Sequence, residues 1–138
     1  GYVKRRTVKM EHTVLFESGT TDAVAMGDAF FLEYMFESLV GSLVASGAKR
    51  IGLSICDERE YIKVEIVGTG VFLSAEQCSN FFVPVSDEAV SMEPLIAREI
   101  VRMHEDFMDI RSLRLMAKEC SEGCVITVTL PKFNFNSK

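Results

Sequence analysis

Few residues of this chain are spaced in a way that could do chemistry. Gly68 and Gly70 follow an apolar run that has the composition of a strand. Two glycines in such a place let backbone N–H groups approach a phosphate, although a tight turn needs them equally. Glu33 and Glu37 fall on the same side of any helix that contains both, where one could act as a general base. Two solvated acids on a helix surface are the ordinary interpretation of that spacing.

The cysteines and histidines do not form a recognisable metal-binding pattern. There is no paired C-x-x-C among Cys56, Cys78, Cys120 and Cys124. Cys120 and Cys124 could be a metal hook, but both histidines are distant in the sequence, so no metal site is expected. The thiols are expected to be free and partly buried in a reducing compartment. We expect His104 to be a cap or surface group at a helix end.

The elements that must position these residues can be read from hydrophobic periodicity and turn chemistry. Phe31, Met35, Leu39 and Leu43 recur at four-residue spacing, and Leu32 and Phe36 widen this apolar stripe. Ser74 and Gln77 resemble a helix capping box. The expected elements are a strand at 12–17, a turn-like stretch at 19–27, a helix at 28–46, a hairpin of strands 50–56 and 61–67, a short helix from 74 to 82, a loop at 84–93, a helix from Pro94, and a second hairpin of 108–117 and 124–130.

This order predicts an α+β fold. Hairpins outnumber crossovers, which favours a two-layer α/β sandwich with a mixed, mostly antiparallel sheet and the helices on one face. The 138 residues fit one domain, with residues 1–10 as an N-terminal lead-in and 11–138 as a single domain. Because the chain begins at Gly1 without Met, we expect it to be the C-terminal part of a longer protein.

Composition excludes several classes of function. Hydrophobic residues make up 48% and charged residues 25%, which is typical of a globular core and not of a disordered chain. The formal charge of −5 argues against nucleic-acid binding, because phosphate contacts require clustered Lys and Arg. No apolar stretch reaches the roughly 20 residues that span a bilayer, so this segment is expected to be cytoplasmic without membrane contact. The parent protein could still be membrane-anchored.

Six stretches in order resemble the motifs of the ATP-binding catalytic domain of sensor histidine kinases. This domain belongs to the superfamily of DNA gyrase, Hsp90 and MutL, and the resemblance covers residues 11–131. Its Asn-box N-L-L-x-N-A-x-K and its strand-end D-x-G-x-G correspond to 38–45 (SLVGSLVA) and 66–70 (IVGTG). The other matches are the Gly-Asp with a following Leu at Gly27, Asp28 and Leu32, the F-x-P-F at 82–85 (FVPV), the glycine-rich helix motif at 91–106 (SMEPLIAREIVRMHED), and the closing G-T-x-F-x-I-x-L-P at 123–131 (GCVITVTLP).

The framework of these motifs is kept, whereas the positions that do chemistry differ. Ser38 and Ser42 stand in the Asn-box, where the family's asparagine bridges Mg²⁺ to the phosphates. A shift of register by one residue would instead place Glu37 and Gly41 there, which supplies no asparagine either. A serine hydroxyl is a shorter and weaker oxygen donor, and Mg²⁺ demands tight octahedral geometry. Ile66 replaces the aspartate that accepts a hydrogen bond from adenine, which leaves that donor unpaired at a cost of roughly 1–3 kcal/mol.

The phosphate-binding end of the resemblance is altered as well. Ser91 and Glu93 replace glycines of the lid motif, so side chains crowd the approach to phosphate and a carboxylate would repel it. Cys124 replaces a threonine that orients the family's aspartate. Gly68 and Gly70 remain.

The resemblance and its departures together predict a degenerate, non-catalytic module of a two-component signalling protein. It would act through docking to an upstream helical dimerisation or sensor region of the parent chain, or to a response regulator. No cofactor is expected in that case. Two alternatives stay open: a functional histidine kinase domain that binds ATP and Mg²⁺ with divergent motifs, and a sensor of a small ligand other than ATP.

Overall fold

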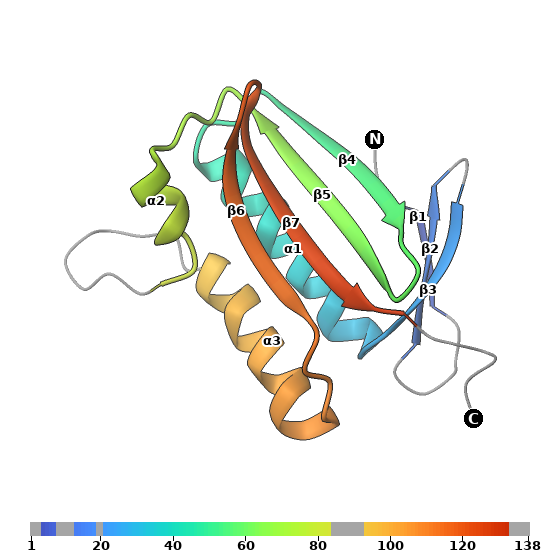
Figure 1. The fold of residues 1–138 in the computed structure, drawn as a ribbon. Helices are drawn as coiled ribbons and strands as arrows, with labels where there is room; N and C mark the ends of the chain where they lie inside the picture. The colour runs from blue at the N-terminus through green and yellow to red at the C-terminus, as the bar shows by residue number, and fades with distance from the viewer. Residues whose placement is uncertain (1–3, 8–12, 19–20, 84–92, 133–138) are drawn as a thin grey trace.

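The computed structural model of the chain describes residues 4–7, 13–18, 21–83 and 93–132. Two sheets and three helices are formed by these residues (Figure 1). In chain order the elements are β1 (Lys4–Thr7), β2 (Thr13–Ser18), β3 (Thr21–Met26), α1 (Ala29–Ala45), β4 (Arg50–Asp57), β5 (Tyr61–Thr69), α2 (Ala75–Ser79), α3 (Glu93–Met108), β6 (Arg114–Cys120) and β7 (Gly123–Pro131). In the described part of the chain no helix is long and apolar enough to cross a membrane.

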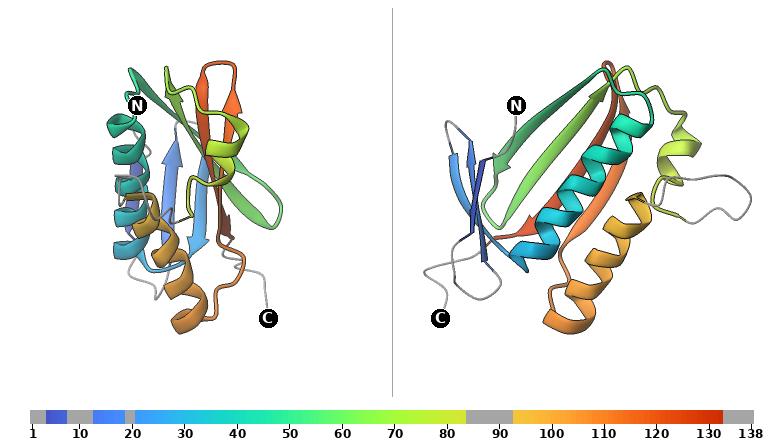
Figure 2. Two further views of the ribbon diagram at one scale, coloured as in Figure 1. Left: turned by 90° about the vertical axis from the view of Figure 1, so that its left-hand side faces the viewer. Right: turned by 180° about the vertical axis from the view of Figure 1, so that it is seen from behind.

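The larger sheet has four strands in the order β4-β5-β7-β6, and the smaller has β1-β2-β3. Helices α1 and α3 cover one face of the larger sheet, and the smaller sheet lies beside the turn between β4 and β5 (Figures 1 and 2). This confirms the α+β, two-layer architecture. Every pairing among the described strands is antiparallel, whereas a mixed sheet was expected.

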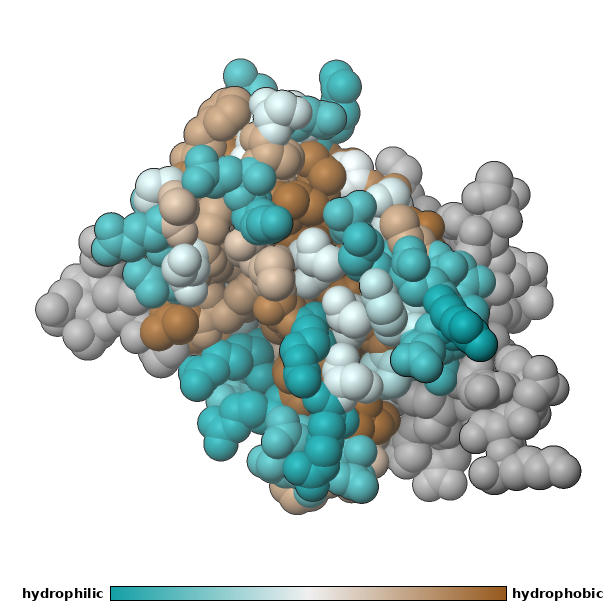
Figure 3. Space-filling view, viewed as in Figure 1, coloured by the Kyte–Doolittle hydropathy of each residue, from teal (hydrophilic) through white to brown (hydrophobic). Residues whose placement is uncertain are grey.

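The two faces of the larger sheet differ in their surroundings. Along β5 and β7 every second side chain is buried toward the helices, as the period of a half-buried strand requires. The other face mixes hydrophilic, intermediate and hydrophobic side chains (Figure 3). The buried side chains of β5 and β7 therefore lie between the sheet and the helices.

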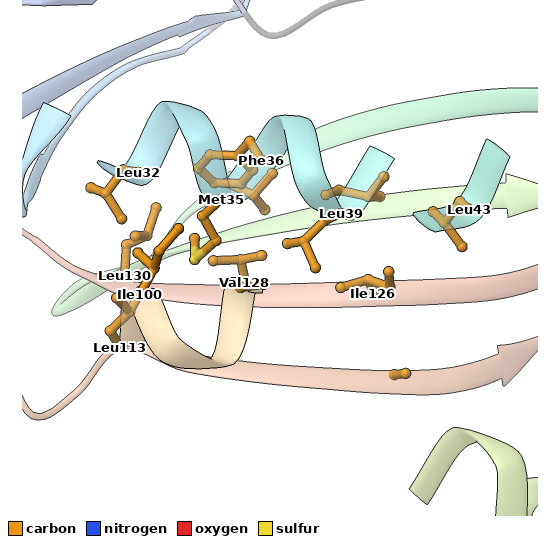
Figure 4. Close-up of a cluster of buried hydrophobic side chains, with 14 of the residues drawn as sticks. Leu32, Met35, Phe36, Leu39, Leu43, Ile100, Leu113, Ile126, Val128 and Leu130 are labelled. Atoms are coloured by element: carbon orange, nitrogen blue, oxygen red, sulfur yellow. The ribbon is translucent and has the colours of Figure 1, made fainter. Parts of the chain in front are cut away.

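Helix α1 provides most of the apolar contact with the sheet. Asp28 caps its first turn, because its Oδ1 accepts a hydrogen bond from Phe31 N at 3.0 Å. Leu32, Met35, Leu39 and Leu43 are at most 1% exposed and point toward β7 and its neighbours (Figure 4). Burying each such side chain contributes about 1.5–3 kcal/mol. The stripe predicted from the sequence is thus the core face, except that Phe31 is only half-buried and faces α3.

Other local predictions are confirmed or corrected by the structure. The capping box of α2 is present, with Ser74 Oγ accepting from Gln77 N at 3.1 Å and Gln77 Oε1 accepting from Ser74 N at 2.8 Å. The turn-like stretch 19–27 contains strand β3, and part of the lead-in forms β1. Residues 108–113 are not a strand: α3 continues to Met108, and β6 begins only at Arg114.

Candidate functional site

The positions that resemble a nucleotide pocket come together where β5 ends under α1. On the helix-facing side of the sheet, Ile66 pairs with Ile126, and Gly68 pairs with Cys124. Leu43 of α1 lies directly over Gly68, where a Cβ would come within 3.0 Å of Leu43 Cδ2. The structure therefore brings Ile66, Gly68 and Cys124 into one cluster beneath the C-terminal half of α1.

Ile66 is wholly enclosed by apolar side chains. It is 0% exposed, as are its neighbours Val64 and Ile126 on the same face of the sheet. An isoleucine offers no hydrogen-bond acceptor, so this position cannot pair with the amino group of a base. The environment is that of a packed core, in which a polar group without a partner is costly.

Ser42 uses its hydroxyl within its own helix. It is 1% exposed, and its Oγ donates a hydrogen bond of 2.7 Å to the carbonyl oxygen of Leu39. Such back-bonding to the preceding turn is common for serine inside helices. Ser38, one turn earlier, is also buried, at 6% exposure. Among the described residues, no group of three or more His, Cys, Asp or Glu side chains is placed to hold a metal ion.

Gly68, Gly70 and Gly123 meet at a close approach of backbone to backbone. Gly70 has φ of 90°, and its N–H donates to the carbonyl oxygen of Glu122 at 2.9 Å. A Cβ on Gly123, whose φ is 152°, would collide with the carbonyl oxygen of Gly68. Glycine is therefore required at position 68 by the packing of Leu43 and at position 70 by the turn, whether or not either residue also binds a ligand.

Glu93 places its carboxyl group against α1. A Cβ built on Gly41 would come within 2.6 Å of Glu93 Oε2 and 3.0 Å of its Cδ, so the absence of a side chain at Gly41 makes room for the carboxyl. From the sequence, Glu93 is expected to act as a lid charge that repels phosphate, and Gly41 enters the Asn-box pair only in an alternative register. Ser91 lies outside the described residues.

Two buried thiols border this cluster. Burial raises the pKa of Cys124 to about 11, and the neighbouring thiols of Cys78 and Cys120 act in the same direction. Burial also raises the pKa of Cys78 on α2, and the two thiols are hydrogen-bonded to each other. Cys56 and Cys120 are partly exposed, and all four cysteines are free. A thiol with a raised pKa is a poor nucleophile at neutral pH.

His104 was misjudged from the sequence, because it is fully buried and not at the surface. Its Nε2 accepts a hydrogen bond from the backbone N–H of Asp28 at 3.0 Å, and its Nδ1 lies 2.8 Å from the carbonyl oxygen of Ile100. These partners require a neutral ring that carries its proton on Nδ1. His104 thus joins the end of α3 to the start of α1. His12 lies outside the described residues.

The helices α1 and α3 form a groove on the outer side of the helical layer, which the sequence did not predict. Its volume is about 540 Å³. Large apolar side chains are exposed in or beside it: Phe107 is 83%, Phe30 70% and Tyr34 46% exposed. Of the two acids considered as a general base, Glu37 is exposed on α1 and Glu33 is half-buried, and neither belongs to the buried cluster. The groove is lined by Phe31, Tyr34, Leu95, Ile96, Glu99, Ile100, Met103 and Phe107.

Several solved structures of histidine kinase domains are similar to this chain. The nucleotide-free catalytic domain of histidine kinase ThkA has a TM-score of 0.67 and 18% identity, covering 80% of this chain and 73% of that one. The mycobacterial sensor histidine kinase MprB has a TM-score of 0.63 and 15% identity, with 81% and 77% covered. The histidine kinase domain of the E. coli osmosensor EnvZ has a TM-score of 0.59 and 16% identity, with 85% and 73% covered.

No family model and no curated protein matches the sequence. The likeness is therefore one of architecture: α1 lies over the β5 and β7 strands as the ordered motifs require, and α3 lies beside it. The chain has the fold of a histidine kinase ATP-binding catalytic domain.

Proposed function

We propose that this domain is a degenerate, non-catalytic module of a two-component signalling protein and that it acts by docking in the cytoplasm. The observation that carries the proposal is the state of three positions that nucleotide chemistry would need. Ile66 is a core residue, the Ser42 hydroxyl is bonded to Leu39, and the Glu93 carboxyl lies against α1. Each bears on a separate step, namely base recognition, metal binding and phosphate approach.

The docking part of the proposal is supported by the groove between α1 and α3. A continuous apolar groove with exposed aromatic side chains suits the apolar face of an amphipathic helix. The charged side chain that lines the groove is Glu99, which is paired with the exposed Arg102 at 3.1 Å, and the chain as a whole carries a formal charge of −5. A basic amphipathic helix from the upstream region of the parent chain is the partner that fits this chemistry.

The test of the nucleotide part is the melting temperature of the domain with and without millimolar Mg-ATP. A ligand at 100 times its dissociation constant adds about 2.7 kcal/mol, which is several degrees for a domain of this size. We expect no shift, whereas the ATP-binding domain of a working histidine kinase, measured in parallel, should show one. A shift with Mg-ATP would overturn the proposal in favour of a functional kinase domain.

A second measurement separates the remaining alternative. The same melting assay with Mg-GTP, cyclic dinucleotides and common metabolites should also show no shift. A reproducible shift with one of these and none with ATP would replace the docking module with a sensor of that small molecule.

A further inference from the structure

Two contacts join α3 to α1 near the ends of the groove, one a hydrogen bond and one a close packing of a side chain on backbone. At one end the Glu93 carboxyl fills the space left by Gly41, and at the other His104 Nε2 accepts from Asp28 N. The helices are antiparallel in this region, because Gly41 is near the end of α1 and Glu93 begins α3. With a rise of 1.5 Å per residue, the two contacts are about 17–20 Å apart along each helix. All residues that line the groove except Phe107 lie between them.

The fit of Glu93 to Gly41 is specific in its geometry. Glycine inside a helix is about 1 kcal/mol less favourable than alanine, so α1 loses stability by having no side chain at Gly41. An alanine there would place its Cβ within 3.1 Å of both carboxylate oxygens and the carboxyl carbon of Glu93. Glu93 is also in the first turn of α3, where a negative charge is favoured by the helix dipole.

In the motifs that this chain resembles, Glu93 stands at a glycine of the lid motif, whereas Gly41 stands at a position of the Asn-box that the motif leaves unspecified. The lid position therefore carries a carboxylate here, and the facing position on α1 carries no side chain. The carboxylate therefore occupies, from within the protein, the space between the two helices at the start of α3.

We propose that Glu93 is a positioning residue that fixes the first turn of α3 on α1 and so keeps the docking groove formed without any nucleotide. This inference rests on the proposed docking function, but the contact itself can be tested independently. The His104 contact holds one end of the groove and Glu93 holds the other. Loss of Glu93 should free the end of α3 that carries Leu95 and Ile96, which are groove residues.

The experiment is hydrogen exchange of the backbone amides of 95–100, measured by mass spectrometry, in variants that attack the contact from each side. Glu93→Ala removes the carboxyl, and Gly41→Ala removes its space while leaving Glu93 in place. We expect exchange in both to be about tenfold faster than in the wild type. Glu93→Gln, which keeps the shape of the side chain, should restore most of the protection.

Gly41→Ala is the sharper variant, because without the contact it should strengthen α1 and slow exchange. Gly52→Ala in β4 is the control for a methyl group added in open space, since a Cβ at Gly52 meets nothing within 4 Å, and it should leave the exchange of 95–100 unchanged. The double variant Gly41→Ala/Glu93→Ala should be less than additive, because the methyl group enters the space that the carboxyl left. Unchanged or slower exchange in Gly41→Ala, or full additivity, would overturn the inference.

Binding of a basic amphipathic Leu/Lys peptide of about 18 residues, measured by calorimetry on the same variants, separates the two proposals. If exchange rises as expected and the wild type binds the peptide about tenfold more tightly than Gly41→Ala, both stand. If exchange rises but the wild type does not bind the peptide, the positioning role of Glu93 stands and the docking function fails. Slower hydrogen exchange of the amides of 95–100 in the wild type on addition of Mg-ATP would contradict both the positioning role of Glu93 and the docking function.

Discussion

The buried cluster under α1 and the groove outside it are formed by the same helix but have opposite character. Inside, Ile66, Leu43 and Cys124 are 0% exposed and pack as a core. Outside, Phe107 and Tyr34 leave large apolar surfaces in water, where a monomeric protein gains nothing from them. One side of α1 is thus closed by packing, whereas the other leaves apolar surface open, which is the arrangement that the proposed docking function requires.

The largest effect should follow from returning a carboxylate to the buried cluster. Ile66→Asp places a charge among fully buried apolar side chains, and we expect a loss of about 4 kcal/mol or more, or failure to fold. Urea unfolding monitored by circular dichroism measures this. Val67→Asp is the matched control, because Val67 is the next residue of β5 and its half-buried side chain lies on the opposite face of the sheet. If Ile66→Asp folded normally and bound Mg-ATP, the cluster would be a pocket and the contrast would disappear.

His104→Ala should come next, because it affects the helix contact shared by both regions. The variant leaves Asp28 N and Ile100 O without their partner and opens a cavity at a fully buried position. We expect a loss of about 3 kcal/mol in the free energy of unfolding. Glu105→Ala, at the exposed neighbouring position, should change it by less than about 0.5 kcal/mol. Equal effects of the two variants would mean that His104 does not join the helices in solution.

Phe107→Ser tests the groove without disturbing the core. Since Phe107 is 83% exposed, the free energy of unfolding should change by less than about 0.5 kcal/mol. Binding of the basic Leu/Lys peptide should weaken about tenfold, because aromatic anchors dominate such interfaces. Phe72→Ser is the control, since Phe72 is 74% exposed but does not line the groove. If both variants weakened binding alike, the peptide would be recognising exposed apolar surface in general.

The smallest expected effect is a pH dependence of the free energy of unfolding, which reports how well water is excluded from the buried cluster. The pKa of Cys124 is raised to about 11 from an unfolded value of 9.0, so the folded state favours the neutral thiol. Its contribution to stability is complete below pH 9 and is lost as the pH rises from 9 to about 11. In urea unfolding at several pH values, Cys124→Ala should show a shallower decline than the wild type. Parallel declines would show that water reaches the Cys124 thiol.

The sequence predicted those parts of the fold that depend on local chemistry. The spacing of Met35, Leu39 and Leu43 identified the core face of α1, and Ser74 with Gln77 identified the start of α2. The start of β6 was misplaced, because Met108, Ile110 and Leu113 are apolar residues of the kind found in strands, although Met108 ends α3 and β6 begins only at Arg114. Periodicity cannot separate these two cases over so few residues.

The candidate site was predicted only as a set of positions. Register along β5 and β7 brings Ile66, Gly68 and Cys124 together, and the motif order anticipated this. Two contacts could not be predicted, because each joins residues that are distant in sequence: Glu93 with Gly41, and His104 with Asp28. A polar side chain at a helix end is ordinarily solvated, and only the tertiary packing of α3 on α1 reverses that expectation.

The hydrogen bond from Asp28 N to His104 spans 76 positions of the chain. Asp28 is the residue that caps α1, so the cap and the last turns of α3 share one bonded unit. Fraying at either helix terminus breaks the same bond, and the two termini should therefore open and close as a single cooperative segment. The start of α1 is therefore held in place by His104, a residue of α3 that is synthesised much later than α1 itself.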